Sequence, residues 1–307
     1  MEKLKASIEI MRPVNGIGAV IGVIVGAIAS GFHLFIDRYF IAVLISFLAA
    51  FLTASAGHTL NDWKDVEIDR INCPERAIPS GRISRNTALV LTIIFFIVGD
   101  IIIFFTKNLQ AIMIVLIGSV LIALYSLELK RLGFIGNITI GILTSFCLLL
   151  GGAVLNKIEY SFWAALLAFV MNIGREITKG VDDFVGDKEE GIKTLAVLFG
   201  KKKASYIAII FLIGTIILSP LPYIFKLYNE LYLLLAVGGV DSIMIISIIL
   251  LLKNPESSDN AHFIKRILKF GMFIGLIAFL VGFPSLILPD PDPFKIVIWK
   301  ITDVLFL

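Results

Sequence analysis

The sequence predicts an all-α polytopic membrane protein, a bundle of nine transmembrane helices. Of the 307 residues, 58% are hydrophobic and 17% are charged, whereas a soluble domain carries about 25% charged residues. The mean hydropathy is +0.95, and the apolar residues fall in runs of about 20, the length that crosses a hydrocarbon core about 30 Å thick. A soluble two-domain protein is therefore excluded. A disulfide scaffold is excluded too, because the chain has only two cysteines.

Each predicted span lies between clusters of charged or turn-forming residues. The spans are expected near residues 14–32, 39–60, 88–106, 109–127, 134–155, 160–178, 204–226, 229–252 and 267–288. Pro220 and Pro222 predict a kink or an end in the seventh span. Gly18, Gly22 and Gly26 recur every four residues in the first span, which favours a close contact with another helix. No long linker interrupts the spans, so residues 1–307 are interpreted as one domain.

The basic residues predict how the spans are oriented. The N-terminus and the loops after spans two, four, six and eight hold 21 of the 27 Lys and Arg residues. Cytoplasmic segments carry such an excess, so the N-terminus and these four loops are expected in the cytoplasm. An odd number of spans then places the C-terminus outside. We expect a multi-pass protein of the cell membrane, in contact with membrane lipid and without a nucleic-acid partner.

Acidic residues gather in the two longest predicted cytoplasmic loops, at about 61–87 and 179–203. Side chains spaced by four share one face of a helix. The residues with this spacing are Asn61, Asp65 and Asp69 in the first loop and Asp183 and Asp187 in the second. Oxygen ligands on two helices suit Mg²⁺, which completes its shell with waters and phosphate oxygens. The pattern predicts two faces that hold metal ions against one diphosphate. The alternative is a pair of solvated loops balanced by basic neighbours.

Several side chains near these faces are candidates for binding a phosphate. Tyr125 and Lys130 lie at the predicted cytoplasmic end of span four, where they could hold a diphosphate or an anionic acceptor. Arg76 lies in a turn-rich stretch beside the first acidic face. The alternative roles are a topological anchor for Lys130 and charge balance for Arg76. Zinc and nucleotide motifs are missing from the sequence.

These residues resemble the UbiA superfamily of intramembrane prenyltransferases over essentially the whole chain. The segment from Asn61 to Asp69 is similar to the NDxxDxxxD motif of that superfamily, and Asp183 to Asp187 matches its DxxxD motif. The stretch from Arg70 to Ser84 is similar to its N-x-P-x-R-P-x-P-S-G stretch, with Ala77 where a proline is usual. Smaller matches are Arg12-Pro13-Val14-Asn15 before span one and Tyr125-Ser126 with Lys130 after span four.

Residues 175–187 look in particular like the R-E-I-x-K-D-x-x-D-x-x-G-D version of the second motif. This version is found in the group of the superfamily that acts on geranylgeranylglyceryl phosphate. Gly180 stands where that group usually has Asp. The departure removes one carboxylate from the second motif, and the neighbouring Asp182 is the candidate for a partial substitute.

The resemblance implies a nine-helix bundle with a lipid-open central cavity and a cytosolic helical cap. It also implies Mg²⁺-dependent transfer of a geranylgeranyl group from geranylgeranyl diphosphate to the sn-2 hydroxyl of geranylgeranylglyceryl phosphate, which forms an ether and releases diphosphate. The implied metal ligands, which are also the catalytic residues, are Asn61, Asp65, Asp69, Asp183 and Asp187. The implied substrate-binding residues are Asn15, Asp62, Arg76, Tyr125, Lys130, Arg175 and Lys179.

Two other functions remain as alternatives. A prenyltransferase of the same superfamily could act on an aromatic acceptor such as a quinone precursor or haem; the R-E-I-x-K element ranks this second. An ion-coupled transporter is the third interpretation. Transporter sites usually lie near the membrane midplane on broken helices, whereas the acids here lie at one predicted face, apart from Asp100 and Asp241. Prenyl chain length and oligomeric state are left open.

Overall fold

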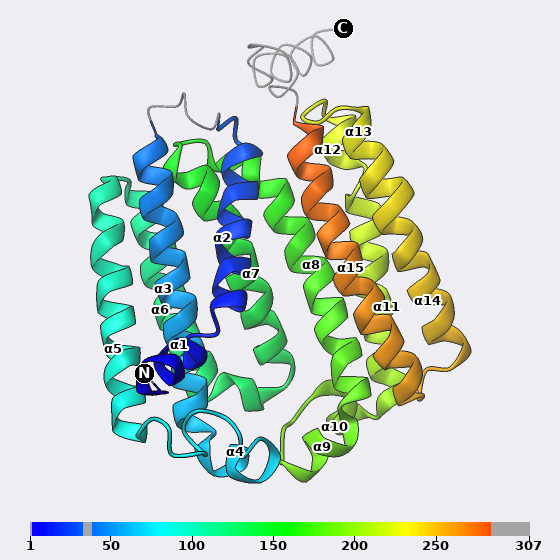
Figure 1. Ribbon diagram of the computed structural model, residues 1–307. Helices are drawn as coiled ribbons and strands as arrows, with labels where there is room; N and C mark the ends of the chain where they lie inside the picture. Colours follow the sequence, from blue (N-terminus) through cyan, green and yellow to red (C-terminus); the bar gives the residue numbers. More distant parts are fainter. Residues whose placement is uncertain (1, 33–38, 284–307) are drawn as a thin grey trace, which may run out of the picture. The chain divides into compact units, whose positions relative to one another are not determined.

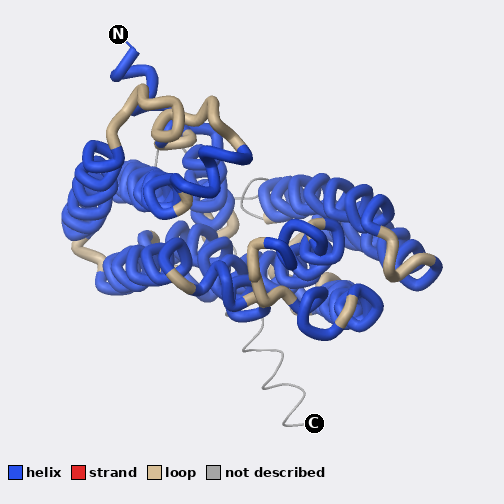
Figure 2. Tube along the Cα trace, turned by 90° about the horizontal axis from the view of Figure 1, so that it is seen from below, coloured by secondary structure: helices blue, strands red, loops and turns tan. Residues whose placement is uncertain are grey.

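The computed structural model describes residues 2–32 and 39–283, and every regular element in these ranges is a helix (Figure 1 and Figure 2). The all-α prediction is confirmed for this part of the chain. The helices pack as two compact units. Unit 1 comprises Met1–Ala165 and Gly191–Lys193, and unit 2 comprises Leu166–Glu190 and Thr194–Leu307. The single-domain assignment stays a prediction, because packing in two units does not show whether either folds alone.

Unit 1 is a bundle of long helices with two short helices at one end (Figure 1). The long helices are α2 (Pro13–Ile28), α3 (Phe40–Lys64), α5 (Arg85–Ile102), α6 (Leu109–Leu127) and α7 (Phe134–Val154). The short helices are α1 (Glu2–Ile10) and α4 (Val66–Asn72), and two 3₁₀ turns are η1 (Ile103–Thr106) and η2 (Leu129–Leu132). Helix α3 packs against α2, α5, α6 and α7. It is therefore the central helix of unit 1.

Helices α2 and α7 approach each other closely through glycine. A Cβ atom on Gly26 would lie 1.8 Å from the carbonyl oxygen of Leu148, and one on Gly22 would lie 2.8 Å from Cβ of Cys147. A Cβ atom on Gly18 would meet no heavy atom within 4 Å. The predicted close contact is confirmed for Gly22 and Gly26 and is wrong for Gly18, which lies off the contact face. Glycine allows this approach because it has no side chain to hold the backbones apart.

Unit 2 holds most of α8 (Ile158–Asp182), which begins in unit 1, and the helices that follow. The short helices are α9 (Phe184–Glu189), α10 (Leu195–Phe199), α12 (Leu221–Ile224) and α13 (Glu230–Leu233). The longer ones are α11 (Lys201–Leu218), α14 (Ser242–Lys253) and α15 (Ser258–Gly282), and the π-helical segment η3 (Leu234–Asp241) joins α13 to α14. Helix α11 ends before Pro220, which confirms the predicted break.

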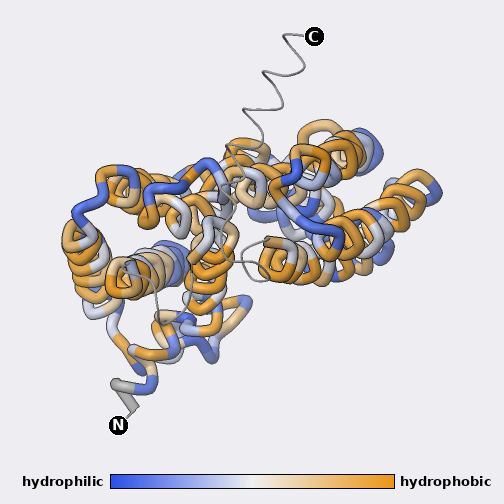
Figure 3. The backbone as a smooth tube through the Cα atoms, turned by 90° about the horizontal axis from the view of Figure 1, so that it is seen from above, coloured by the Kyte–Doolittle hydropathy of each residue, from blue (hydrophilic) through white to orange (hydrophobic). Residues whose placement is uncertain are grey.

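Six helical segments are long and apolar enough to cross a membrane by length and composition. They are Phe40–Lys64, Arg85–Thr106, Leu109–Leu127, Phe134–Val154, Lys201–Ile224 and Glu230–Lys253, which correspond to predicted spans two to five, seven and eight. Apolar residues run along most of the helices, and hydrophilic residues gather in the connections (Figure 3). Helices α2, α8 and α15 occupy the other three predicted spans but fall outside the six. The count of nine spans stays a prediction, and residues 284–288 of the ninth lie outside the described residues.

Candidate functional site

The first acidic cluster lies where α3 is followed by α4. Asp65 separates the two helices, with φ −86° and ψ 10°. The backbone hydrogen bonds continue across this break, since the N–H of Asp65 donates to the carbonyl of Asn61 at 2.9 Å and the N–H of Asp69 to that of Asp65 at 2.8 Å. The helical extension predicted from the spacing is therefore confirmed, with a local change of direction at its middle member.

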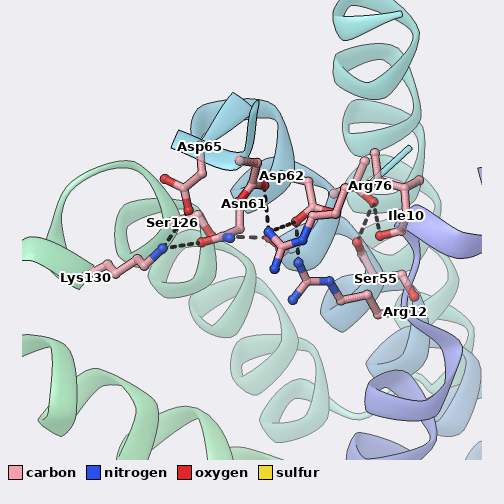
Figure 4. A network of polar contacts seen from close by, with 12 residues as sticks. Ile10, Arg12, Ser55, Asn61, Asp62, Asp65, Arg76, Ser126 and Lys130 are labelled. Atoms are coloured by element: carbon pink, nitrogen blue, oxygen red, sulfur yellow. Dashed lines mark hydrogen bonds and ion pairs between the residues drawn. The ribbon is translucent and has the colours of Figure 1, made fainter. Parts of the chain in front are cut away.

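Lys130 contacts this cluster from a different segment, the turn η2. Its Nζ donates to Oδ2 of Asp65 at 2.6 Å and to Oδ1 of Asn61 at 3.3 Å (Figure 4). Ser126, near the end of α6, donates to the carbonyl of Gly57 at 3.3 Å and so ties α6 to α3 close to the cluster. Lys130 contacts two of the predicted ligands. It is thus more than a topological anchor.

Arginine side chains link the remaining two carboxylates of the first cluster, and Figure 4 shows Arg12, Asp62 and Arg76 of this row. Arg12 donates to Oδ1 of Asp62, and Nη1 of Arg76 lies 3.8 Å from the same oxygen. Nη1 of Arg76 also donates to Oδ2 of Asp69 at 2.6 Å. Burial lowers the pKa of Arg76, but the hydrogen bond to Asp69 and the charges of both aspartates raise it above its ordinary value. The guanidinium therefore stays charged.

The three aspartates of the first cluster are shielded from solvent. The exposed fractions of their side chains are 10% for Asp62, 12% for Asp65 and 8% for Asp69. Charge pairs in such surroundings are stronger than in water. The predicted site residues are thus brought together in two neighbouring groups of contacts, Lys130 with Asn61 and Asp65, and Arg76 with Asp62 and Asp69.

Arg12 is a residue of the network that the sequence-based prediction omits. It lies between α1 and α2 in a left-handed backbone conformation, φ 48° and ψ 63°. Asn15, the predicted residue in this stretch, is exposed on the first turn of α2, so Arg12 rather than Asn15 contacts Asp62. The only signal in the sequence is the Arg-Pro pair before span one.

Tyr125 is half-buried on α6 next to Ser126.

The short helix α1 is anchored beside the first cluster. Ala6 and Ile10 are buried in an apolar group with Val66 of α4 and with residues of the 77–88 stretch. Arg82 donates to both carboxylate oxygens of Glu9, at 2.5 and 2.8 Å. These contacts hold the segment that bears Arg12 against the loop that bears Arg76.

The second acidic cluster repeats this backbone arrangement where α8 is followed by α9. Asp183 separates the helices with φ −81° and ψ 8°. The N–H of Asp183 donates to the carbonyl of Lys179 and the N–H of Asp187 to that of Asp183, both at 2.9 Å. Asp183 and Asp187 thus hold the same relative positions as Asp65 and Asp69. The repeated spacing in the sequence corresponds to a repeated local structure.

The contacts of the second cluster come from α15. Lys265 donates to Oδ2 of Asp182 and its Nζ lies 3.5 Å from Oδ1 of Asp183. Nδ1 of His262 lies 3.2 Å from the same oxygen of Asp182. Neither Lys265 nor His262 belongs to the predicted site. Their only sequence signal is a spacing of three at the start of a helix.

Asp187 is the carboxylate of the second cluster whose pKa is raised. Burial, with the nearby charge of Asp183, raises its pKa to about 6, while a hydrogen bond with Thr194 and the charge of Lys179 oppose the shift. A hollow of about 360 Å³ lies beside it, lined by Asp182, Asp183, Val185, Gly186, Asp187 and Glu190. A divalent cation in this hollow would relieve the repulsion between its carboxylates.

Arg175 and Lys179 lie on α8, one to two turns before Asp183. Arg175 donates to Oε1 of Glu176 at 2.5 Å, and Nζ of Lys179 lies 3.8 Å from Oε2 of the same glutamate. Nε of Arg175 is buried and has no hydrogen-bond partner among the described residues. The structure ties both predicted substrate-binding cations to Glu176 rather than to the aspartates.

Gly180 is buried on α8, three residues before Asp183. A Cβ atom there would lie 3.5 Å from Cβ of Thr194 and no closer to any other side chain, which is ordinary van der Waals contact. The Cβ atom of an aspartate would therefore fit at this position without displacing the neighbouring side chains. Asp182 is not a free substitute for the carboxylate that is missing at position 180, because its own carboxylate already contacts Lys265 and His262.

The ligands available in both clusters fit magnesium. No group of three or more His, Cys, Asp or Glu side chains in the described ranges is arranged to hold a metal by itself. Mg²⁺ is usually held by one or two carboxylates, with waters and substrate phosphates filling the other positions. Each cluster supplies oxygen ligands in that number: Asp65 and Asp69 with the amide of Asn61, and Asp183 with Asp187.

Comparison with known proteins agrees with these features. The model of the UbiA prenyltransferase family matches residues 19–282. The chain is 36% identical over 275 residues to digeranylgeranylglyceryl phosphate synthase of Methanosphaera stadtmanae, an alignment that covers 90% of this chain and 98% of that protein. It is 37% identical to a solved structure of digeranylgeranylglyceryl phosphate synthase, with a TM-score of 0.82 and coverage of 92% and 99%.

A more distant solved structure shares the fold. It is a UbiA homologue from Archaeoglobus fulgidus bound to DMAPP and Mg²⁺, 17% identical, with a TM-score of 0.66 and coverage of 90% of this chain and 99% of that one. The family match speaks against the transporter alternative. Asp100 and Asp241, which lie away from the predicted acidic face, accept hydrogen bonds from Ser119 and Ser219, each at 2.6 Å. The family match and the full-length similarity lead to one conclusion: the chain belongs to the UbiA prenyltransferase family.

Proposed function

We propose that this prenyltransferase moves a geranylgeranyl group from geranylgeranyl diphosphate to the sn-2 hydroxyl of geranylgeranylglyceryl phosphate. The C1–O bond to diphosphate breaks, an ether bond forms, and the hydroxyl proton is released. The observation that carries the proposal is similarity along nearly the whole chain, with 36% identity and 98% coverage, to a protein named digeranylgeranylglyceryl phosphate synthase. The two acidic clusters supply the features that a diphosphate donor requires.

The two clusters have separate tasks in this proposal. Asn61, Asp65 and Asp69 form one metal-binding face, and Asp183 and Asp187 form the other. Mg²⁺ held by these residues would neutralise the charge that develops on the departing diphosphate. The UbiA homologue bound to DMAPP and Mg²⁺ supports this choice of metal. The carboxylates serve by position and charge, so their amide analogues are expected to fold but to bind metal poorly.

The basic side chains orient the phosphates. Lys130 and Arg76 already contact the first face at 2.6 Å. A diphosphate bound there would accept hydrogen bonds from their remaining donor groups. Arg175, Lys179 and Tyr125 are proposed to contact the leaving diphosphate or the acceptor phosphate, and Asn15 and Asp62 complete the proposed set. The apolar spans shelter the allylic cation from water and hold the two prenyl chains, because exclusion of water limits hydrolysis.

The orientation in the membrane belongs to the same proposal. The cation excess in the N-terminus and in the loops after even-numbered spans supports a cytoplasmic N-terminus and a cytoplasmic active site, with the C-terminus outside. The nine-span count, the lipid-open cavity and the cytosolic helical cap are proposed on the same grounds.

The acceptor is tested with purified protein, Mg²⁺ and geranylgeranyl diphosphate. Geranylgeranylglyceryl phosphate is offered in one reaction and 4-hydroxybenzoate in another, and products are identified by mass spectrometry. We expect a diether phosphate in the first reaction and no adduct in the second. Product formed only with the aromatic acid would contradict the proposal and favour the aromatic-acceptor alternative. Matched reactions with EDTA test the metal.

A further inference from the structure

The ion pairs between α15 and the second acidic cluster suggest a specific role for one lysine. Lys265 has 22% of its side chain exposed, and its Nζ contacts Asp182 and lies 3.5 Å from Asp183. Asp182 is 13% exposed and also faces His262, whereas Asp183 is 40% exposed. Lys265 thus pairs closely with the shielded carboxylate of Asp182 and lies farther from the more exposed carboxylate of Asp183.

We propose that Lys265 is a positioning residue that keeps the second acidic face a weak metal site until diphosphate arrives. This inference rests on the proposed function, in which Asp183 and Asp187 bind Mg²⁺. Lys265 acts in two ways. It withholds Asp182 from the metal, and its charge offsets part of the negative charge of Asp183.

The residues that line the hollow explain why a cation is needed to weaken metal binding there. Four carboxylates, those of Asp182, Asp183, Asp187 and Glu190, line it. Without a nearby cation, such a group would attract a divalent ion strongly before any substrate is bound. Lys265 is the basic side chain that the structure places against two of the four. Ser258, at the start of α15, donates to the carbonyl of Val181 at 3.4 Å and helps to keep this helix end beside the cluster.

A weak site favours joint binding of metal and diphosphate. If the metal binds poorly alone, most of its affinity comes from the diphosphate oxygens, so each ligand strengthens the other by the same factor. The same coupling lets the metal leave with the released diphosphate. A lysine near a metal–diphosphate complex is also less unfavourable than one near a bare metal ion, because the complex carries less positive charge.

The test compares metal binding with and without an unreactive donor. Mn²⁺ binding to detergent-purified protein is measured by electron paramagnetic resonance, alone and with geranylgeranyl S-thiolodiphosphate. Without the analogue, we expect Lys265→Gln to bind Mn²⁺ about tenfold more tightly than the native protein, because a unit charge near the metal is removed. With the analogue, the difference should largely disappear. Lys265→Arg should behave like the native protein.

Controls assign the effect to the named contacts. Lys269→Gln removes an exposed lysine one turn further along α15 and should leave Mn²⁺ affinity unchanged. In the double variant Lys265→Gln/Asp182→Asn, the gain should shrink, because the released carboxylate is absent. Unchanged or weaker Mn²⁺ binding in Lys265→Gln would overturn the inference. Asp187→Asn distinguishes failure of the proposed metal site from failure of the proposed role of Lys265. If Asp187→Asn leaves Mn²⁺ binding intact, the proposed metal site is wrong. If Asp187→Asn weakens Mn²⁺ binding but Lys265→Gln has no effect, only the role of Lys265 is rejected.

Discussion

Helix α3 stops at Asp65 and helix α8 stops at Asp183 with nearly the same backbone angles, φ −86° and ψ 10° in the first case and φ −81° and ψ 8° in the second. Four residues later, Asp69 and Asp187 close the same hydrogen-bonded turn. The surroundings differ. Asp69 contacts Arg76 at 2.6 Å, whereas Asp187 lies near Asp183 in a hollow lined by carboxylates, and its pKa is raised to about 6.

The difference shows that two clusters with the same backbone conformation can have different charged neighbours. In the first cluster, Asp62, three residues before the break, is held by Arg12 and Arg76. The corresponding position of the second cluster is Gly180, which has no carboxylate that could form ion pairs with arginines. We infer that the first face is ordered by its own ion pairs and that the second depends more on the metal.

The largest effects are expected from the aspartates at the two breaks. Asp65→Asn and Asp183→Asn should each lower kcat/KM by at least about 100-fold, because each removes a proposed ligand of the metal ion that would neutralise the departing diphosphate. Turnover is measured with both isoprenoid substrates, and folding is checked by thermal unfolding in detergent. Glu67→Gln is the matched control, since Glu67 is exposed and pairs with Arg70 at 2.8 Å on the same short helix. Full activity in either aspartate variant would remove that residue from the site.

Arg12→Ala should destabilise unit 1, with a loss of about 3 kcal/mol in unfolding free energy, because it leaves a shielded carboxylate without its main partner. Thermal and denaturant-induced unfolding in detergent measure the change. The double variant Arg12→Ala/Asp62→Asn should recover part of the loss, since the two residues act as a pair. Arg70→Ala, which breaks an exposed pair, should cost at most about 1 kcal/mol. Equal losses in Arg12→Ala and Arg70→Ala would show that the first cluster does not rely on its internal pairs.

Metal binding should weaken in acid through the second cluster. Asp187 has a pKa raised to about 6 by burial and by Asp183, so a proton occupies it as the pH falls below 6 and removes the charge that the metal needs. Mn²⁺ affinity should therefore drop by about tenfold between pH 7 and pH 5. The measurement is a Mn²⁺ titration at several pH values. Asp187→Asn should flatten this dependence, and an unchanged profile in that variant would assign the titration to another group.

The smallest effect is expected from Gly180→Asp. Its Cβ atom fits beside Thr194 at 3.5 Å, and the new carboxylate adds negative charge to the second cluster. Mg²⁺ should support half-maximal activity at a concentration about twofold to fivefold lower, since solvent near the cluster screens part of the added charge. Gly180→Asn is the control of equal shape. The same Mg²⁺ dependence in both variants would mean that a carboxylate at position 180 is not a ligand.

Much of the fold follows from local properties of the sequence. Apolar runs of about 20 residues predicted the helices of both units, and Pro220 predicted the break after α11. The spacing of four predicted that Asn61, Asp65 and Asp69 share a helical face, because helix geometry depends on neighbouring residues only. The family motifs located both clusters. The count of nine spans does not follow from length and composition alone, since α2, α8 and α15 are shorter or more polar than the other six.

The partners of each carboxylate were decided by tertiary structure. Arg12 and Asp62 are 50 residues apart in the chain, and His262 lies 80 residues beyond Asp182. No local pattern selects such a partner from the 27 Lys and Arg residues and the three histidines. By itself the sequence determined a membrane-embedded helical prenyltransferase with two acidic motifs. Only packing decided that arginines contact the first motif and that Asp187 of the second lies in a hollow lined by other carboxylates, because electrostatic environment depends on distance in space and on shielding from water.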